Sequence, residues 1–407
     1  MVITITIYQI LMCLFAFITL LKIDHWVVRL FDFPKVQLLT LSLLGLFFGL
    51  FFFSFDSIMQ WVGTVMVSLA IIFHCIKIIP YTVFFKKEVI RTVPTDSSIC
   101  LSLLTSNVLM PNQDYEKLLS RIDTYQPDVL LTLESDIKWE KKLKPIEEKY
   151  PYTVKLPQDN LYGMHLYSKL ELEDVQIHYF VKEHIPSIEA YLRIDKQHRI
   201  KIFALHPKPP SPTEAKTSTN RDAELLLVAK RVKELNEPVL VFGDLNDVAW
   251  SKSTLLFRKI SGLLDPRIGR GRFSTFHAQH KLLRWPLDHL FHSEDFSLNK
   301  IQVLSEIGSD HFPIYAKLEL NKKPKLNMKV MNLALKKKNW PMIKLRRLFK
   351  SQKFLFQIKF KLALQYKFHK TIFVSWNISL SLLENTDPKL LMTLLDRKPS
   401  PILCSMP

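Results

Sequence analysis

Cysteine is scarce in this chain of 407 residues, and its positions exclude two common kinds of site. The four cysteines are Cys13, Cys75, Cys100 and Cys404, and no two of them have a C-x-x-C spacing. A zinc site or a disulfide framework cannot be built from such scattered residues. Because isolated cysteines occur on both sides of a membrane, they do not indicate the compartment.

Charge is missing from three long segments near the N-terminus. Residues 2–21, 36–55 and 57–76 contain no Asp, Glu, Lys or Arg, and each is 20 residues long. A helix of about 20 apolar residues crosses the hydrocarbon core of a bilayer. No Lys or Arg precedes the first segment and no small-residue cleavage pattern follows it, which argues against a cleaved signal peptide. We therefore predict a membrane anchor of three transmembrane helices in residues 1–85.

Acidic residues are missing from a long stretch near the C-terminus. Between Lys322 and Lys370 there are 16 Lys or Arg and no Asp or Glu, and residues 321–407 have a net charge of +16. The whole chain has a net charge of +18, so only +2 is left for everything before this tail. Residues 321–407 are predicted to form a basic amphipathic or disordered tail. Anionic lipid and nucleic acid are its two candidate partners, and the anchor favours lipid.

Between the anchor and the tail the pattern changes to alternating strands and helices. A polar juxtamembrane linker is expected at 86–97, followed by a single α/β domain at 98–320. Periodicity predicts strands at 99–109, 128–133, 152–156, 162–167, 175–180, 188–194, 200–205, 239–242, 287–291, 300–303 and 313–320. It predicts helices at 115–125, 220–235 and 254–260.

Polar side chains lie at the ends of these predicted strands, where a sheet holds functional groups rigidly and still exposes them. They are Asn107, Glu134, His206, Asp244, Asn246, Asp288, Asp310 and His311. Each also has an ordinary structural interpretation. Asn107 is a frequent type of turn residue, Gly243-Asp244 is common turn chemistry, and His206 is compatible with a strand-end histidine that has no catalytic role.

The order of the segments that hold these residues argues against coincidence. They read Thr-Ser-Asn107, Leu-Thr-Leu-Glu134-Ser, Leu-His206-Pro, Gly-Asp244-Leu-Asn246-Asp, Pro-Leu-Asp288-His-Leu-Phe and Gly-Ser-Asp310-His311-Phe-Pro. This set resembles the endonuclease/exonuclease/phosphatase family, which includes DNase I-like nucleases, sphingomyelinases and inositol-phosphate phosphatases. The resemblance covers residues 98–320. It implies a DNase I-like four-layer α/β sandwich, here preceded by three transmembrane helices.

Three further segments are similar to the bacterial, membrane-anchored branch of the family. They are Leu-His206-Pro-Lys-Pro-Pro, Asp-Val-Ala-Trp250-Ser and Trp285-Pro-Leu-Asp288-His. The chain departs from the family pattern at Ser168-Lys169, where a strand usually ends in Ser-Arg. Lysine meets phosphate as a point charge, so phosphate binding is not excluded there, but a bidentate contact is lost.

The resemblance also implies a role for each site residue. Asn107, Glu134 and Asp310 would supply oxygen ligands to Mg²⁺ or Mn²⁺, which prefer carboxylate and amide oxygens.

The remaining residues would act on the phosphoryl group and the attacking water. His206 and Asn246 would donate hydrogen bonds to the phosphoryl oxygens, and Asp244 would orient or deprotonate the water. Asp288 would hold the ring of His311, which acts either as a proton donor or as an electrostatic clamp.

We therefore expect a membrane-anchored, metal-dependent hydrolase of phosphoester or phosphoanhydride bonds. A lipid-linked or membrane-proximal phosphate is the favoured substrate, because the anchor holds the site close to a bilayer. A nuclease is the first alternative, although the nearly neutral domain lacks the expected basic face. A non-catalytic membrane scaffold of the same fold is the second, and it would not need the residues of metal and phosphate chemistry.

The charges that flank the predicted spans bear on the location of the domain. Lys22, Arg29 and Lys35 precede the second span, and Lys86 and Lys87 follow the third. The positive-inside rule then places the domain in the cytoplasm. The resemblance to the bacterial branch implies that the membrane is a bacterial inner membrane. The resemblance points the other way, because some relatives are thought to face the extracytoplasmic side.

Overall fold

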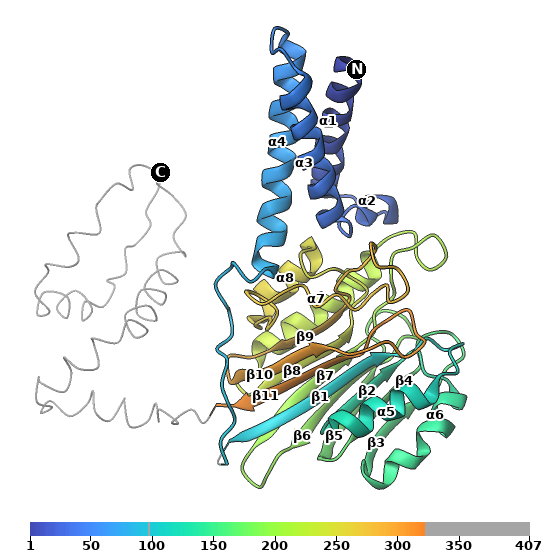
Figure 1. The fold of residues 1–407 in the computed structure, drawn as a ribbon. Helices are drawn as coiled ribbons and strands as arrows, with labels where there is room; N and C mark the ends of the chain where they lie inside the picture. Colours follow the sequence, from blue (N-terminus) through green and yellow to red (C-terminus); the bar gives the residue numbers. More distant parts are fainter. Residues whose placement is uncertain (97, 322–407) are drawn as a thin grey trace, which may run out of the picture. The chain divides into compact units, whose positions relative to one another are not determined.

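The computed structural model describes residues 1–96 and 98–321 (Figure 1). Of the predicted tail only Asn321 falls within these residues, so the predicted basic tail lies outside the described part of the chain.

Three apolar helices run side by side at the N-terminal end (Figure 1). They are α1 (Val2–Phe17), α3 (Lys35–Phe52) and α4 (Ile58–Ile78), and 3-10 turns extend α1 to Leu20 and α4 to Tyr81. Each of the three is long and apolar enough to cross a membrane. The helices approach closely around the buried Gln9, because Gly49 and Gly63 leave no Cβ to collide with its amide.

The rest of the described chain contains two mixed β-sheets. The first has the strand order β10-β11-β1-β2-β4-β3 and the second the order β5-β6-β7-β8-β9. The strands of the first sheet are β1 (Ile99–Asn107), β2 (Val129–Leu133), β3 (Tyr152–Leu156), β4 (Met164–Ser168), β10 (Phe296–Val303) and β11 (Ile314–Leu320). Those of the second are β5 (Glu171–His178), β6 (Ser187–Arg193), β7 (Arg199–Leu205), β8 (Val239–Asp244) and β9 (Asp288–His292).

Alternating side chains join the two sheets to each other and to helices. On β8, Leu240 and Phe242 point into the core between the sheets, while Val239 and Val241 pack under helices on the other face. Those helices are α7 (Thr219–Glu234) and α8 (Lys252–Ser261); α5 (Tyr115–Tyr125), α6 (Ile137–Leu143) and the 3-10 turn Lys144–Glu148 cover the first sheet. The domain is thus a four-layer α/β sandwich, as predicted.

Each sheet contains one parallel pair of neighbouring strands, β1 with β2 and β7 with β8. The carboxyl ends of parallel strands meet at one edge of a sheet, where ligands bind in many α/β proteins. Asn107 ends β1, Glu134 follows β2, His206 follows β7 and Asp244 ends β8. The topology therefore brings four of the predicted site residues to the same edge of the sandwich.

The apolar helices contact the loop that follows β8. Ile78 and Tyr81, at the end of α4, share a buried cluster with Val248, Ala249 and Trp250. The Tyr81 hydroxyl donates to the carbonyl oxygen of Ala249 at 2.7 Å. The Trp250 indole donates to a carbonyl oxygen in the connection that follows the short helix α2 (Trp26–Leu30), also at 2.7 Å.

Candidate active site

The first sheet contributes Asn107 and Glu134. Asn107 is buried, and its amide nitrogen donates to a Glu134 carboxylate oxygen at 2.7 Å and to the Asp244 carboxylate of the other sheet at 3.2 Å. Glu134 has φ 56°, a left-handed conformation that costs a residue with a Cβ about 1 kcal/mol or more. Strain of this kind is typical of sites where a turn aims a side chain inward.

The second sheet contributes His206, Asp244 and Asn246. Asp244 is fully buried and receives a hydrogen bond at 2.9 Å from the backbone N–H of Asn246. The Nε2 atom of His206 lies 4.0 Å from an Asp244 oxygen, while its Nδ1 is buried and has no hydrogen-bond partner in the described part of the chain. Gly243 before Asp244 is required, because a Cβ would overlap the Leu205 carbonyl of the neighbouring strand.

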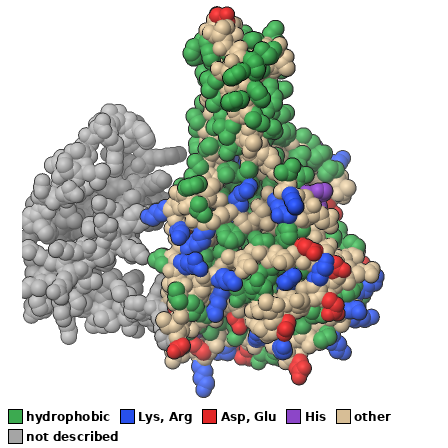
Figure 2. Space-filling model, viewed as in Figure 1, with side chains coloured by type: hydrophobic (Ala, Val, Ile, Leu, Met, Phe, Trp, Pro, Cys, Tyr) green, Lys and Arg blue, Asp and Glu red, His purple; other side chains and the backbone are tan. Residues whose placement is uncertain are grey.

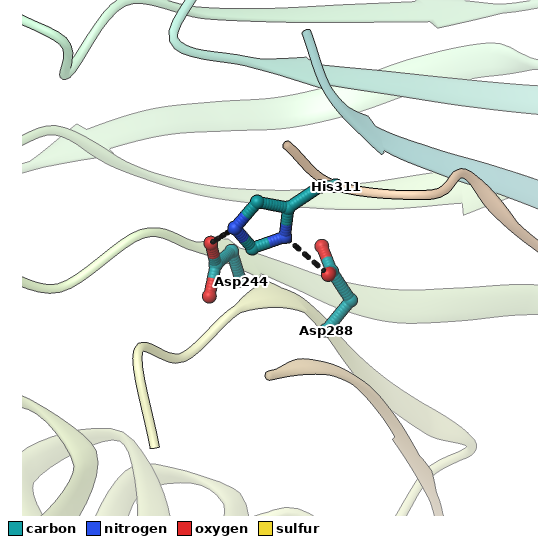
Figure 3. A group of neighbouring side chains, drawn as sticks. All are labelled: Asp244, Asp288 and His311. Atoms are coloured by element: carbon teal, nitrogen blue, oxygen red, sulfur yellow. Dashed lines mark hydrogen bonds and ion pairs between the residues drawn. The ribbon is translucent and has the colours of Figure 1, made fainter. Parts of the chain in front are cut away.

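The ring of His311 lies between two buried carboxylates (Figure 3). Its Nδ1 is 2.8 Å from an oxygen of Asp288, which begins β9, and its Nε2 is 3.5 Å from an oxygen of Asp244. Asp310 precedes the ring, and its carbonyl oxygen accepts the backbone N–H of Ala278 at 2.7 Å.

The two carboxylates favour a charged imidazolium at His311. Burial opposes charge on the ring, but the attraction of Asp288 and Asp244 outweighs it and raises the pKa of His311 to about 10. In return, although burial favours a neutral acid, His311 and His206 hold the pKa of Asp244 below its usual value. The ring is therefore positively charged at neutral pH and has both nitrogens directed at carboxylates.

The carboxylates of the site fit a divalent cation. Burial, with smaller contributions from the carboxylates of Asp310 and Asp244, raises the pKa of Glu134 to about 7, against the opposing effects of the Asn107 hydrogen bond and the His311 charge. An ion between Glu134 and Asp310 would remove this repulsion, and hard cations prefer such oxygens. Asp244, Asp288 and His311 also lie within 4.8 Å of one another, a spacing that could hold a metal. We favour the first location, because both nitrogens of His311 already face carboxylates.

The structure places two residues differently from a simple interpretation of the sequence. Asn107 turns its amide nitrogen, not its oxygen, to Glu134 and Asp244, so in this conformation it orients the carboxylates, and its amide would have to turn over to become a ligand. Lys169 lies beyond Ser168, which pairs with Val129 at the opposite end of β2 from Glu134. Its ammonium group donates to a backbone carbonyl there, at the end of the sheet away from the candidate active site.

Two buried arginines support the site and were not predicted from the sequence. Arg221 on α7 donates to the carbonyl oxygen of Asn246 at 2.8 Å and pairs with Asp247 at 3.2 Å. Arg267 pairs with Asp265 and donates to the carbonyl oxygen of Asp288 at 3.3 Å. Both side chains are almost fully buried. Arginine is usually exposed, so no signal in the sequence marks them.

The sequence profile of the endonuclease/exonuclease/phosphatase family matches residues 104–311. This stretch includes every candidate site residue and half of the chain. The chain belongs to this family. Its members are generally phosphoester hydrolases that commonly use divalent metals, and the candidate active site has the residue types for that chemistry. No match is found among the curated proteins.

A comparison with solved structures finds proteins that are similar to part of this chain. D. rerio TDP2 complexed with single strand DNA product is 18% identical, with 55% of this chain and 99% of that chain covered and a TM-score of 0.46. The human Nocturnin catalytic domain with bound sulfate anion is 15% identical, with 56% and 97% covered and a TM-score of 0.46. Beta toxin from Staphylococcus aureus is 16% identical, with 53% and 99% covered and a TM-score of 0.40. Identities this low do not identify a substrate.

Proposed function

We propose that this protein is a membrane-anchored, metal-dependent hydrolase of phosphoester or phosphoanhydride bonds, acting on a lipid-linked or membrane-proximal phosphate. The observation that supports the chemistry best is the convergence of the Glu134, Asp244 and Asp310 carboxylates beside the charged ring of His311. Carboxylates at this density favour a bound cation, and a cationic ring beside them favours an anionic substrate.

Glu134 and Asp310 would hold the ion, Mg²⁺ or Mn²⁺, and Asn107 would fix the Glu134 carboxylate. When bound, the ion offsets the charge of the phosphoryl oxygens. The Nε2 atom of His206 lies 4.0 Å from an Asp244 oxygen, so the ring would donate a hydrogen bond to a phosphoryl oxygen held beside that carboxylate.

The other side chains of the site orient the water and the leaving group. Asp244 is ionised at neutral pH and accepts hydrogen bonds, which suits a carboxylate that orients the attacking water. His311 is protonated and held by Asp288, so it would stabilise the negative charge that develops in the transition state.

The preference for a lipidic substrate rests on location. Of the three helices that could cross a membrane, α4 ends and α3 begins in a buried cluster with the loop beside Asn246, so the site would lie close to the bilayer surface. Confinement of enzyme and substrate to one surface raises their effective concentration. Outside the tail the net charge is only +2, which does not favour a polynucleotide.

The test measures hydrolysis by the full chain in detergent micelles, with Mg²⁺ or with EDTA. The substrates are bis-p-nitrophenyl phosphate, a lipid pyrophosphate, a phospholipid and a single-stranded oligonucleotide. We expect turnover to require the metal and to be fastest on a lipid phosphate. Glu134→Gln should need much more Mg²⁺ for half-maximal turnover, while the exposed Glu148→Gln should titrate like the parent.

Each outcome separates the alternatives. Full activity in EDTA would refute the metal-dependent mechanism. Preference for the oligonucleotide would identify a nuclease, and no turnover on any substrate would support a scaffold.

For sidedness we propose that the catalytic domain faces the cytoplasm. Lys22, Lys86 and Lys87 lie at the same end of the helix bundle as the domain, whereas the opposite turn carries only Asp56. Alkaline phosphatase and green fluorescent protein fused after Leu320 report opposite compartments. Phosphatase activity with dark fluorescent protein would reverse this assignment.

A further inference from the structure

A pocket of about 770 Å³ lies between the first turns of α3 and the segment Arg272–Arg284, which we call the 272–284 segment. It is lined by Val36, Gln37, Thr40, Leu41, Arg272, Phe273, Ser274, Lys281, Leu282 and Arg284. The volume is in the usual range for a site that binds a small molecule.

The position of the pocket relative to the candidate span is set by α3. The span begins at Lys35, and Leu41 is six residues further along the helix, so this wall extends about 9 Å into the span. The wall therefore starts near the lipid headgroups and reaches the first methylenes of the acyl chains. Figure 2 shows Lys and Arg side chains on the domain just below the apolar bundle. The pocket therefore opens where a membrane surface would lie.

The charge of the pocket is positive and unneutralised. Arg272, Lys281 and Arg284 line it, and the lining residues, all in the described part of the chain, include no Asp or Glu. None of the three cations has an ion pair within residues 1–96 and 98–321. Arg284 is fixed, because it donates to the Ala278 carbonyl at 3.1 Å and its guanidinium stacks 4.8 Å from the Phe312 ring centre. Its Nε has no hydrogen-bond partner among the described residues.

The rest of the lining is mixed: Val36, Leu41, Phe273 and Leu282 are apolar, and Gln37, Thr40 and Ser274 are polar but uncharged. Val36 and Leu41 are the apolar residues of the helix wall. At the tip of the segment Leu282 is 84% exposed, and its neighbour Leu283, outside the lining, is 46% exposed. The amide of Gln37 donates to the Leu282 carbonyl at 2.6 Å and holds this tip against α3. Exposed leucines beside a span and next to cations suit an amphiphile, with its charged group at the cations and its chain along the helix.

We propose that this pocket binds one anionic phospholipid, whose phosphate meets Arg272, Lys281 and Arg284 and whose acyl chain lies along α3. This rests on the membrane anchorage in the proposed function. A polynucleotide has no aliphatic chain to cover the apolar wall, and a free phosphate ester would also leave that wall exposed to water. A phospholipid fits both parts of the pocket, because its phosphate pairs with the cations and its acyl chain covers the apolar wall.

The same segment contacts the active site. The Phe276 ring packs against the His311 ring at 4.9 Å, the Ala278 N–H bonds the Asp310 carbonyl, and the Thr275 hydroxyl accepts the Asp288 N–H at 3.2 Å. A lipid that holds the 272–284 segment against α3 thereby also holds the backbone around Asp310 and His311. The pocket thus connects the membrane surface to the active site.

The experiment measures lipid retention, not hydrolysis. The full chain in micelles with EDTA is given equal amounts of phosphatidylglycerol and phosphatidylcholine with the same acyl chains, and bound lipid is counted by native mass spectrometry. We expect the parent to retain phosphatidylglycerol preferentially. Arg272→Gln/Lys281→Gln/Arg284→Gln should weaken its binding about a hundredfold.

A matched control removes three exposed lysines from the far side of the domain, Lys138→Gln/Lys141→Gln/Lys144→Gln, and should bind like the parent. Lys281→Gln alone is an exposed change that leaves folding intact, and it should weaken binding several fold. Glu134→Gln should retain the lipid, so failure of the hydrolase proposal would not affect this result.

Two outcomes would overturn the proposal. Equal retention of both lipids by the parent would show that the three cations of the pocket do not select for an anionic headgroup. Displacement of the lipid by an equal concentration of glycerol 3-phosphate would show a site for a soluble phosphate ester instead.

Discussion

Asp288 and His311 form the closest charged contact of the candidate active site, so they should act as one unit. Asp288→Asn removes the carboxylate that orients and charges the ring, and His311→Ala removes the ring. Each change should lower turnover by a factor of about 10² to 10⁴. The double variant should lose much less than the product of the two factors, because residues that act together are not additive.

The measurement is turnover on bis-p-nitrophenyl phosphate at saturating Mg²⁺. Thermal unfolding of each variant is the control, since both side chains are buried. Losses that multiply strictly would show that the two residues work independently.

Glu224 on α7 gives the fold a dependence on pH. Burial raises its pKa to about 7, while the Ser187 hydroxyl donates to it at 2.6 Å. The folded protein therefore binds this proton more tightly than the unfolded chain. The resulting stabilisation is fully present below about pH 4.5 and is lost as the pH rises to about 7, with an upper bound of roughly 3 kcal/mol.

Glu224→Gln keeps the neutral form at every pH, so its melting temperature should fall less than that of the parent between pH 4.5 and 7.5. The exposed Glu148→Gln is the matched control and should follow the parent. Identical curves for Glu224→Gln and the parent would show that Glu224 is ionised in the folded protein.

At the scale of elements, the end of α4 supports the loop that carries Asn246. Tyr81→Phe removes the bond to the Ala249 carbonyl, and Tyr150→Phe removes a bond of equal length, 2.7 Å, to the Pro127 carbonyl elsewhere in the domain. Both tyrosines are buried, so each change should cost about 1 kcal/mol of unfolding free energy. Only Tyr81→Phe loosens the loop beside the site, and it alone should lower turnover several fold.

Thermal unfolding and turnover of the two variants in micelles check this prediction. Equal turnover of Tyr81→Phe and Tyr150→Phe would mean that the helix bundle does not support the site.

At this scale, the bounds of individual strands could be predicted from the local alternation of apolar and polar residues. The predicted strands 152–156 and 200–205 match β3 and β7 within a residue or two, because alternating β-branched and apolar residues mark a half-buried strand. The order of strands depends on contacts between distant segments, which periodicity does not contain. For the same reason the sequence could not place Lys169: only the pairing of β4 with β2 shows which end of the sheet it occupies.

In the candidate site, too, some features follow from local sequence and others depend on contacts between distant segments. Its residues could be found from their types and order, but the amide orientation of Asn107 and the ring position of His311 depend on bonds between the two sheets. Arg221 and Arg267 were missed because burial of an arginine is decided by partners far along the chain, Asp247 and Asn246 for the first.

At the scale of the whole molecule, the helix bundle and the domain share a buried surface. Ile78 and Tyr81 pack against Trp250, and Phe33 and Val36 pack at the edge of the same cluster. A fragment that begins at Arg91 would expose this cluster to water. Experiments on the catalytic domain are therefore best done with the helices retained.

The C-terminal end of the domain permits a cleaner cut. Strand β11 pairs along its full length with β1 and β10, and Asn321 closes the edge by accepting a bond from Ser297 at 2.7 Å. Every candidate site residue precedes it.

We expect a chain that ends at Asn321 to keep its melting temperature and its metal-dependent turnover of bis-p-nitrophenyl phosphate. Its binding to vesicles with anionic lipid should become weaker and less dependent on salt, because removal of residues 322–407 removes most of the net charge. Co-sedimentation with vesicles at low and high salt measures this, and vesicles of phosphatidylcholine alone are the control. Loss of turnover on the soluble substrate would show that the tail contributes to the catalytic domain.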